Sequence, residues 1–560
     1  MNAFSVLAKK ISRRLTRTPK RIASPKQQEK QEKRDSRAED IRPDSPGLDR
    51  RLELVRERLG ESRDVVTRSF TSGNGRVRLA ILYIDGMVDR KLLSDNIIHP
   101  LQDSNQLQRY YKELKPSNAL QMIPELVVSG SEVAIAPDLT QALKQVLSGD
   151  TALLVDGEER ILILGTRFWA MRAVTEPETE SAVRGPREGF TETLRVNTSL
   201  LRRRLRHEKL RLETMRAGRR TGTDIVVAYI DDLVNPHVLA EVRQRIAAID
   251  TDAILESGYI EEFIEDTPWC VFPQLEHTER VDKAAAAILE GRVVIMTDNT
   301  PLVLIVPTFF FQFLQAAEDY YERPFIGIAL RMLRLFVINV ALILPATYVA
   351  VITFHQEMLP TPLLLSIAAA REGIPVPAVA EALLMEATFE VLREAGVRLP
   401  KTVGQAVSIV GGLVVGDAAI RAGLVSPSMV IIVATTAIST FAIPTFSAAI
   451  ALRLLRFPLL FLGGIMGLYG VMFGLLVILI HLAGLQSFGV PYLTPLAHGT
   501  ALDALKTFAR PPWWLALWRP KVLGTPDRRR QAGNMRYYPA PPEERELTHE
   551  ETGEKDAGKR

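Results

Sequence analysis

Three long stretches without a charged residue constrain the fold of this chain more than any other feature. They are Leu335–Phe354, Leu424–Leu452 and Phe457–Leu485. A helix of about 20 apolar residues is long enough to cross the hydrocarbon layer of a bilayer, and each stretch reaches that length. The sequence therefore predicts a membrane all-α region, and it excludes a purely soluble protein.

A shorter apolar run, rich in Gly, predicts a further span over 403–422. Arg331 and Arg334 precede the first span, and Arg528–Arg530 follow the last. Lys and Arg gather on the cytoplasmic side of membrane proteins, so both ends of the helical domain are expected there, which requires an even number of crossings. Arg453 and Arg456 do not fit four crossings, because they would then face outward, and five or six crossings stay open. The transmembrane helical domain is expected over 326–500, with spans at 335–354, 403–422, 424–452 and 457–485.

A repeat dominates the part of the chain that precedes this domain. The stretch LAILYIDGMVD around Tyr83 matches IVVAYIDDLVN around Tyr229. A second pair of matching stretches lies around Gly149 and Gly291, at nearly the same offset along the chain. Two pairs at nearly the same offset indicate a tandem duplication. The predicted fold class is therefore α/β plus membrane all-α, with cytosolic tandem duplicated α/β subdomains followed by a polytopic transmembrane helical domain.

The repeat also sets the predicted domain boundaries. The two α/β subdomains occupy 51–189 and 222–325, and a long charged helix over 190–221 connects them. Residues 1–50 carry an excess of Lys and Arg and too few apolar groups to offset the entropy of ordering, so they are expected to form a disordered basic arm. Residues 501–560 are expected to form a cytoplasmic tail that is largely disordered. No signal peptide is visible, so the soluble N-terminal region is expected to stay cytoplasmic.

The sequence lacks the motifs of the common enzyme classes. It contains no phosphate-binding glycine loop, no HExxH zinc helix and no GxSxG nucleophile turn. Cys270 is the only cysteine, which excludes a disulfide framework and CxxC metal sites. The 69 Lys and Arg residues nearly balance the 65 Asp and Glu residues, so net charge gives no argument for a nucleic-acid partner. We therefore expect no catalytic residues, no cofactor and no metal site.

The 403–422 span is the first candidate for a pore-lining helix. Small and polar residues fall on one helical stripe, and valines at helical spacing alternate with them to form a candidate apolar gate. Polar groups inside a membrane need water or partners, and an intramembrane acid is by default a functional candidate. The acid of this span can instead simply pair with Arg421 at i+4. The candidate pore or gate residues are Gln405, Val407, Ser408, Val410, Gly412, Val414, Gly416 and Asp417.

The 424–452 span is the second candidate. Its hydroxyl side chains surround a proline that kinks a helix, and they are suited to line a water path. Each hydroxyl can equally bond to a carbonyl of its own helix. Residues 376–398, just before the first candidate, predict an amphipathic helix with Glu381, Glu386, Glu390 and Glu394 on its polar side. The residues of the second candidate are Thr436, Ser439, Thr440 and Pro444.

Several short motifs, taken together, resemble one protein family over about residues 60 to 500. They include Arg187-Glu-Gly-Phe190, Glu256-Ser-Gly-Tyr259, Pro268-Trp-Cys-Val-Phe-Pro-Gln274, Glu318-Asp-Tyr-Tyr-Glu-Arg-Pro324, Gly396-Val-Arg-Leu-Pro400, Leu452-Arg-Leu-Leu-Arg-Phe-Pro458 and Phe488-Gly-Val-Pro-Tyr-Leu493. On these motifs the chain resembles the A-subunit class of the GerA family of spore germination receptors.

The resemblance implies a multi-pass protein of the inner spore membrane that works with a permease-like B subunit and a lipoprotein C subunit. It also implies a homo-oligomeric ring, near a pentamer, that opens as a nutrient-gated cation channel in the membrane lipids and triggers germination. A related spore membrane channel protein of the dipicolinate-release operon is an alternative. A small-solute secondary transporter is another, disfavoured because many transporters carry repeats within the membrane, and a scaffold that recruits cytosolic partners is the third.

Overall fold

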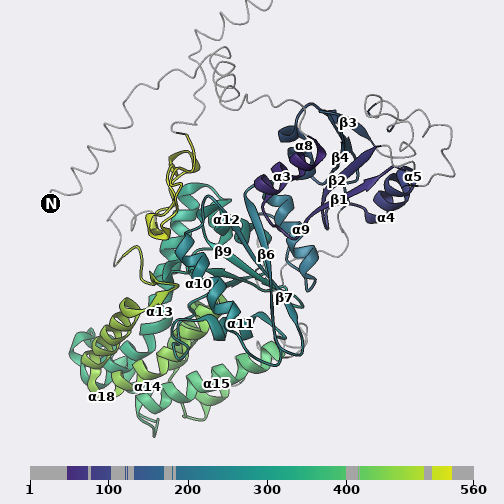
Figure 1. Ribbon diagram of the computed structural model, residues 1–560. Coiled ribbons are helices and arrows are strands. Elements are labelled where there is room, and N and C mark those ends of the chain that lie inside the picture. The colour runs from purple at the N-terminus through teal and green to yellow at the C-terminus, as the bar shows by residue number, and fades with distance from the viewer. Residues whose placement is uncertain are drawn as a thin grey trace, which may run out of the picture. The chain divides into compact units, whose positions relative to one another are not determined.

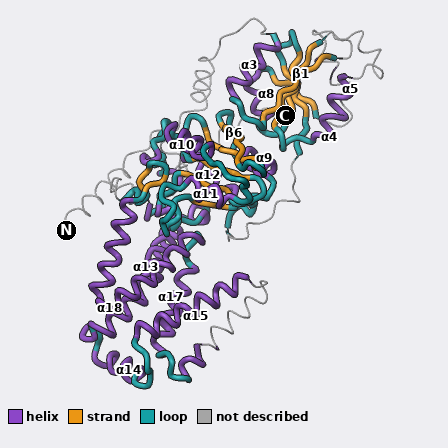
Figure 2. Tube along the Cα trace, turned by 60° about the horizontal axis from the view of Figure 1, so that its bottom comes forward, coloured by secondary structure: helices purple, strands orange, loops and turns teal. Residues whose placement is uncertain are grey.

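The computed structural model describes residues 47–72, 77–102, 120, 123, 132–168, 180, 184–398, 414, 416–496 and 507–532. The described chain divides into two compact units, and the larger one contains residues 47–510 and 520–528. Within the smaller unit, the short helix η7 (Trp513–Leu515) precedes a single β-bridge between Trp518 and Arg529. The larger unit contains two five-stranded β-sheets, a two-stranded hairpin and a group of long helices (Figures 1 and 2).

The first sheet has five strands in the order β1-β2-β4-β5-β3, and every neighbouring pair is antiparallel. Both faces of its central strands are covered, which explains why those strands are continuously apolar in the sequence. Alternate residues of β2 face the helices α3 (Leu48–Leu59) and α8 (Leu139–Val146) on one side. The short helices α4 (Arg90–Leu92), η2 (Leu93–Ile98) and α5 (His99–Gln102) follow β2, and residues of η2 and α5 cover the other side. The strands are β1 (Val65–Thr71), β2 (Arg78–Ile84), β3 (Val133–Ala136), β4 (Thr151–Val155) and β5 (Ile161–Leu164).

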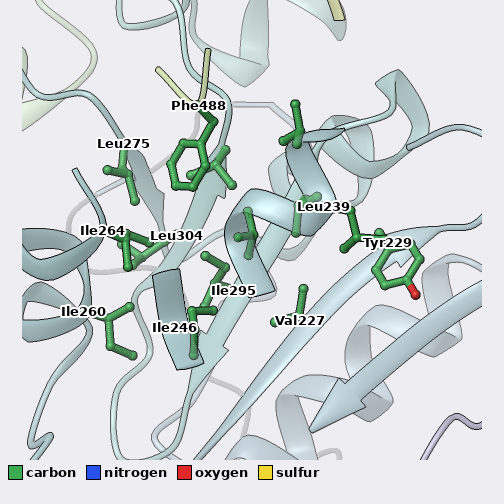
Figure 3. Close-up of a cluster of buried hydrophobic side chains, with 14 of the residues drawn as sticks. Val227, Tyr229, Leu239, Ile246, Ile260, Ile264, Leu275, Ile295, Leu304 and Phe488 are labelled. Atoms are coloured by element: carbon green, nitrogen blue, oxygen red, sulfur yellow. The ribbon is translucent and has the colours of Figure 1, made fainter. Parts of the chain in front are cut away.

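The second sheet repeats this order as β6-β7-β9-β10-β8, again with antiparallel neighbours. Helices α9 (Leu194–Arg204) and α12 (Val281–Glu290) cover one face. Helices α10 (Pro236–Ala247) and α11 (Ser257–Ile264) cover the other, where Figure 3 shows Phe488 beside side chains of the sheet and of α11. The strands are β6 (Leu210–Ala217), β7 (Thr223–Ile230), β8 (Glu276–Thr278), β9 (Val293–Thr297) and β10 (Val303–Val306).

The two sheets also share their pairing register. Leu79 pairs with Val155 in the first sheet, and Ile225 pairs with Thr297 at the equivalent positions of the second. At the edge of each sheet, Ala134 pairs with Ile163 and its counterpart Glu276 pairs with Ile305. The repeat in the sequence therefore corresponds to a repeated fold.

The structure corrects the prediction for the connection between the subdomains. The helix expected over 190–221 ends at Arg204, and Leu210–Ala217 forms the edge strand β6 instead. Leu210 and Leu212 are both buried, at the alternating spacing of a strand, and β6 pairs along its whole length with β7. The side chain of Arg202 in α9 makes two hydrogen bonds, of 2.9 and 3.0 Å, to the carboxylate of Asp64 in the first subdomain.

Part of the tail expected to be disordered also has a defined structure. Residues 521–523 form the short helix η8 (Lys521–Leu523), and Leu523 is buried in the core of the second subdomain. The carbonyl of Leu523 accepts a hydrogen bond of 3.2 Å from the Asn235 side chain. Leu523 therefore packs this segment against the core of the second subdomain. The charged residues around Leu523 hide this signal in the sequence.

The helical region begins directly after the second subdomain. Its described residues include two helices that are long and apolar enough to cross a membrane by length and composition. These are α13 and α18, and they pack against each other and against α15 and α17. Figure 2 shows α13, α15, α17 and α18 as neighbouring helices. The helices are α13 (Pro324–Phe354), η6 (Gln356–Met358), α14 (Thr361–Arg371), α15 (Ala378–Arg398), α17 (Pro427–Phe441) and α18 (Phe446–Gly484).

The predicted span 424–452 is two helices rather than one. Helix α17 ends at Phe441, and residues 442–445 separate it from the start of α18. Pro444 lies in this break. Proline favours a break here because it lacks the backbone N–H that a continuous helix requires and because it restricts the residue before it. The break is anchored by Thr445, whose hydroxyl donates a hydrogen bond of 3.1 Å to the carbonyl of Phe313.

Helix α18 folds back on itself at Gly467, so the predicted span 457–485 is also not a single helix. Gly467 has φ 63° and ψ −145°, which is outside the helical region. A Cβ atom placed on Gly474 would lie 2.5 Å from the Leu459 side chain, although residues 459 and 474 of a straight helix are about 22 Å apart. We call residues 446–466 the first arm and residues 468–484 the second arm of α18. Glycines at the contact let the two arms approach closely.

Candidate pore-forming region

The helices of this region lie between two ends, which the contacts define. The near end touches the second subdomain, where Thr445 at the start of α18 bonds to Phe313. The far end is at Gly467, which lies against Phe354 and His355 at the end of α13. Helix α13 and the first arm of α18 therefore run from the near end to the far end, and the second arm returns.

Helices α15 and α17 run in the opposite direction to α13. The first turn of α17 is at the far end, where the Ser428 hydroxyl lies 2.6 Å from the Tyr348 hydroxyl of α13. Helix α15 reaches the near end at Arg393, which donates a hydrogen bond of 3.1 Å to Thr440 in the last turn of α17. At Gly423 the chain is again at the far end, beside the carbonyl of Gly373.

The near end is joined to the second subdomain by the short hairpin that follows α18, β11 (Gln486–Ser487) and β12 (Val490–Pro491). The Ser487 hydroxyl accepts from the Thr308 backbone N–H at 3.1 Å and donates to the carbonyl of Gln274 at 2.9 Å. The Tyr492 hydroxyl donates to the carbonyl of Pro273 at 2.6 Å. These bonds tie the last helix directly to the sheet edge that carries β8.

A cluster of buried charges joins α15 to the first arm of α18. Glu386 accepts a hydrogen bond of 2.5 Å from Arg456, and both side chains are almost completely buried. One turn away, Glu390 pairs with Arg453. Arg456 also donates to the carbonyl of Ala341 in α13 at 2.9 Å. Arg453 and Arg456, which do not fit a prediction of four crossings, therefore lie inside the helical region. Acidic side chains of α15 neutralise their charges there.

The acidic side of α15 faces the protein interior along most of its length. Glu381 is completely buried and accepts hydrogen bonds from the backbone N–H and the hydroxyl of Ser426, at 2.6 and 2.5 Å. Arg371 lies 3.5 Å from the other carboxylate oxygen of Glu381. Glu394 differs, because it pairs with Arg398 on the exposed surface. Breaking a buried ion pair costs about 3–5 kcal/mol, so the Glu386–Arg456 pair, in which both side chains are buried, holds α15 strongly in place.

The hydroxyl groups of the second pore candidate are already satisfied within one chain. Thr436 donates to the carbonyl of Ile432 at 2.7 Å, and Ser439 donates to the carbonyl of Thr435 at 2.8 Å. Thr440 donates to the carbonyl of Ala437 at 2.6 Å. Thr436, Ser439 and Thr440 are all buried. Helix α17 therefore packs its polar face inside the chain, as the alternative interpretation of these hydroxyls expects.

The described end of the first pore candidate has the opposite character. Val414 is 56% exposed, and Asp417 pairs with Arg421 at 2.9 Å through two exposed side chains. Gly416 is buried, and a Cβ atom there would lie 3.7 Å from Val430 of α17. This end therefore touches α17 through a glycine and presents Val414 and Asp417 outward. The remaining candidates, Gln405, Val407, Ser408, Val410 and Gly412, lie outside the described residues.

The comparisons with known proteins identify the family. Residues 53–522 match the family described as Bacillus/Clostridium GerA spore germination protein. The chain belongs to this family. It is 47% identical to an uncharacterized membrane protein, YfkQ, of Bacillus subtilis over 86% of this chain and 92% of the relative. It is 44% identical to spore germination protein KA of Bacillus subtilis over 89% of this chain and 90% of the relative.

A solved structure is also similar to this GerA-family chain. It is the N-terminal domain of the A subunit of the Bacillus megaterium spore germinant receptor GerK3, with 36% identity and a TM-score of 0.38. The match covers 48% of this chain and 99% of that domain. Among the residues that the structure describes, no group of three or more His, Cys, Asp and Glu side chains is placed to hold a metal ion.

Sequence reasoning missed the charge cluster of this GerA-family protein. The signal was present as two arginines at i and i+3, Arg453 and Arg456, in an otherwise uncharged region. Two acids at i and i+4 in the preceding amphipathic helix, Glu386 and Glu390, have the spacing of one helical face. The arginine pair in this apolar stretch is therefore better interpreted as facing an acidic partner helix than as part of a loop.

Proposed function

We propose that this chain is the A subunit of a spore germinant receptor whose copies form a ring around a cation pore in the inner spore membrane. The helical region lies in the bilayer, with its near end and the α/β subdomains on the cytoplasmic side. Membership of the GerA family over residues 53–522 and the two long apolar helices support this proposal.

The directions of the helices support six crossings rather than four. Helices α13, α15 and α17 and the two arms of α18 each run between the near and far ends, which gives five crossings. Residues 403–422 follow α15 and precede α17 in the sequence, and we infer that they make the sixth crossing. An even number of crossings keeps both ends of the region on one side, as the arginine distribution requires. The charges of α15 are compatible with a membrane position because Arg453 and Arg456 neutralise them inside the protein.

The observation that carries the choice of pore helix is the contrast between its two candidates. The hydroxyls of α17 are buried and satisfied within one chain. The end of the 403–422 segment instead presents Val414 and Asp417 outward, where neighbouring copies or water can meet them. We therefore assign the pore to 403–422, with Val407, Val410 and Val414 as an apolar gate that closes by dewetting.

In this proposal Asp417 lies at the outer mouth of the pore and raises the local concentration of cations there. The ring is near a pentamer. A permease-like B subunit binds the nutrient, and a lipoprotein C subunit completes the receptor. Nutrient binding then opens the gate, and the release of cations triggers germination. The A subunit itself has no catalytic role.

Substitutions at the gate test this assignment in spores. Val410→Ala and Val414→Ser should let water enter the constriction, so that spores leak cations and germinate without nutrient. Polar substitutions on α17, Thr436→Asn and Ser439→Asn, should instead reduce the amount of protein, because these sites are buried. The assignment is wrong if the valine variants merely fail to accumulate while the α17 variants cause the leak.

A further inference from the structure

We propose that a loop of the second subdomain, residues 267–271, inserts Trp269 into the headgroup layer of the bilayer and so sets the depth of the near end. The inference rests on the proposed membrane position of the helical region. It assigns a lipid contact to a part of the chain that sequence patterns place in the cytosolic half.

Trp269 is the most exposed large apolar side chain of the second subdomain among the described residues, at 98% of its free surface. Val271, two positions later, is also exposed. The stretch from 267 to 275 contains no charged residue. A tryptophan normally buries a large apolar area when it can, so an uncharged loop that holds one almost wholly outside the protein is expected to have a non-aqueous neighbour.

The loop is held rigidly, so the exposure of Trp269 is a property of its geometry. Gln274 clamps the start of the loop, because its side-chain amide bonds to the N–H and the carbonyl of Thr267 at 3.0 and 2.7 Å. The Cys270 N–H donates to the same carbonyl at 3.0 Å and closes a tight turn. Phe272 is buried and packs edge-on against Phe310, with ring centroids 6.0 Å apart. Residues on both sides of Trp269 are therefore fixed.

Contacts of Cys270 place the loop at the end of the last helix. Its sulfur lies 3.2 Å from Nε2 of His481, in the final turn of the second arm of α18. The residues just before His481 present apolar side chains to the outside, including Leu476, Leu479 and Ile480. His481 is the first polar side chain after this apolar surface. Trp269 therefore lies one residue from the contact with the first polar side chain that follows this apolar surface.

This position matches the depth at which tryptophan gathers in membrane proteins. The indole ring prefers the boundary between headgroups and acyl chains, because its body is apolar and its N–H is polar. The Cys270–His481 contact places the loop next to the end of the second arm, whose preceding residues expose apolar side chains. The proximity of the loop to those exposed apolar side chains favours lipid over a second copy of the chain as the neighbour of Trp269.

Depth-dependent quenching tests the inference, because the chain has a single natural cysteine, Cys270. In a Cys270→Ser background, a bimane label is attached to the full-length protein through Trp269→Cys, Leu476→Cys or Glu241→Cys. Leu476 is in the middle of the second arm, and Glu241 is on α10 of the same subdomain as Trp269. The proteins are placed in phosphatidylglycerol-containing vesicles whose acyl chains are brominated either near the headgroup or near the terminal methyl.

We expect the label at 269 to lose more fluorescence to bromine near the headgroup than to bromine near the methyl end. The label at 476 should show the reverse, and the label at 241 should be quenched by neither. If 476 is quenched while 269 behaves like 241, the anchor is wrong and the membrane position stands. If 476 is not quenched, the membrane position fails and the anchor fails with it. A label at 269 that escapes lipid quenching but self-quenches between copies would assign the loop to a subunit interface, which also overturns the inference.

Discussion

The two copies of the α/β subdomain have the same strand order and register, but they differ in what their edges carry. In the first copy the positions equivalent to Glu276, Lys283 and Arg292 are Ala134, Gln141 and Asp150, at the offset that relates the two sheet edges. In the second copy Glu276 is buried between Lys283, at 3.0 Å, and Arg292, at 2.8 Å. Burial alone raises the pKa of Glu276, but these two cations outweigh it and lower the pKa to about 2.

The cores of the two copies also differ in origin. The first copy, in its described part, builds both of its core clusters from residues between 48 and 164. The second copy takes in Phe488 and Val490 from the hairpin after α18, and Leu523 from the tail. The same fold thus serves as a self-contained subdomain in one place and as the base of the helical region in the other. Its added charges and the side chains that it takes from the hairpin and the tail distinguish the copy that adjoins the helical region.

Exchanging residues between the copies should produce the largest effect. Glu276→Ala gives the second copy the residue of the first and leaves Arg292 buried without its carboxylate partner, which should cost about 3–5 kcal/mol of unfolding free energy. The reciprocal Ala134→Glu, on an exposed position, should change stability by less than about 0.5 kcal/mol. Chemical unfolding of the detergent-solubilised full chain measures both. Equal costs would show that the two edges do not differ in the way described.

A double-mutant cycle compares the Arg456–Glu386 pair of the helical region with the charges around Glu276 in the second copy. Arg456→Met and Glu386→Leu should each destabilise the protein, because each leaves the other charge buried. The double variant should recover part of that loss, with a coupling energy of about 2 kcal/mol. Thermal unfolding of the four proteins in the same detergent gives the coupling. A coupling near zero would mean that this pair does not hold α15 on α18.

The pH dependence of stability should further distinguish the second copy from the first. Burial raises the pKa of Glu261 on α11 to about 7, with the charges of Glu265 and Glu256 adding to it. Because the pKa is raised in the folded protein, stability is lost as pH rises from about 4.5 through about 7. Glu261→Gln should therefore stabilise the chain at pH 8 by about 1–2 kcal/mol, after allowance for solvent screening of this partly exposed group.

At pH 4 the Glu261→Gln variant and the natural chain should be equally stable, because the carboxyl is then protonated in both the folded and the unfolded state. Glu276, whose pKa is lowered, has the opposite sign, and its contribution is lost only as pH falls from about 4.5 towards about 2. Melting temperatures at pH 4, 6 and 8 follow Glu261, and melting temperatures at lower pH, towards about 2, follow Glu276. A constant difference between Glu261→Gln and the natural chain from pH 4 to pH 8 would contradict the raised pKa.

The smallest effect is expected at the exposed pair beside the proposed pore. Asp417→Asn removes the partner of Arg421, but both side chains are exposed, so stability should change by less than about 0.5 kcal/mol. Cation flux through an opened pore should nevertheless fall, because the local negative charge is lost. Stability measured by melting, together with flux measured in vesicles, separates these two effects. A large loss of stability would mean that Asp417 has a structural role instead.

The sequence was sufficient for the sheets but not for the helical region. Apolar strands at two matching offsets predict a repeated fold, because strand sequence and pairing register are coupled when both faces are buried. A long uncharged stretch carries no comparable signal for the positions at which it divides into separate helices. The fold-back at Gly467 is encoded by glycines at 463, 467, 470 and 474, which are equally compatible with close packing of a straight helix.

The pore candidates illustrate the same limit. The polar stripe of 403–422 and the hydroxyls of α17 are indistinguishable as patterns, because a serine or threonine is equally suited to line water or to bond to its own helix. Only the positions of neighbouring helices decide between them, as they do for Thr436 and Ser439. The buried partners of Arg453 and Arg456 likewise depend on a contact between helices far apart in the sequence.

Cation flux from reconstituted vesicles tests the central claim most directly. The purified chain is inserted into vesicles loaded with K⁺, as the natural protein and as Val410→Ala, and crosslinking in the same vesicles records whether it is oligomeric. The account predicts that the natural ring stays closed without nutrient and that the Val410→Ala ring releases K⁺ passively. Saturable solute uptake would indicate a transporter instead. Vesicles that stay tight with an inserted, oligomeric Val410→Ala protein would contradict the claim that this chain forms the pore.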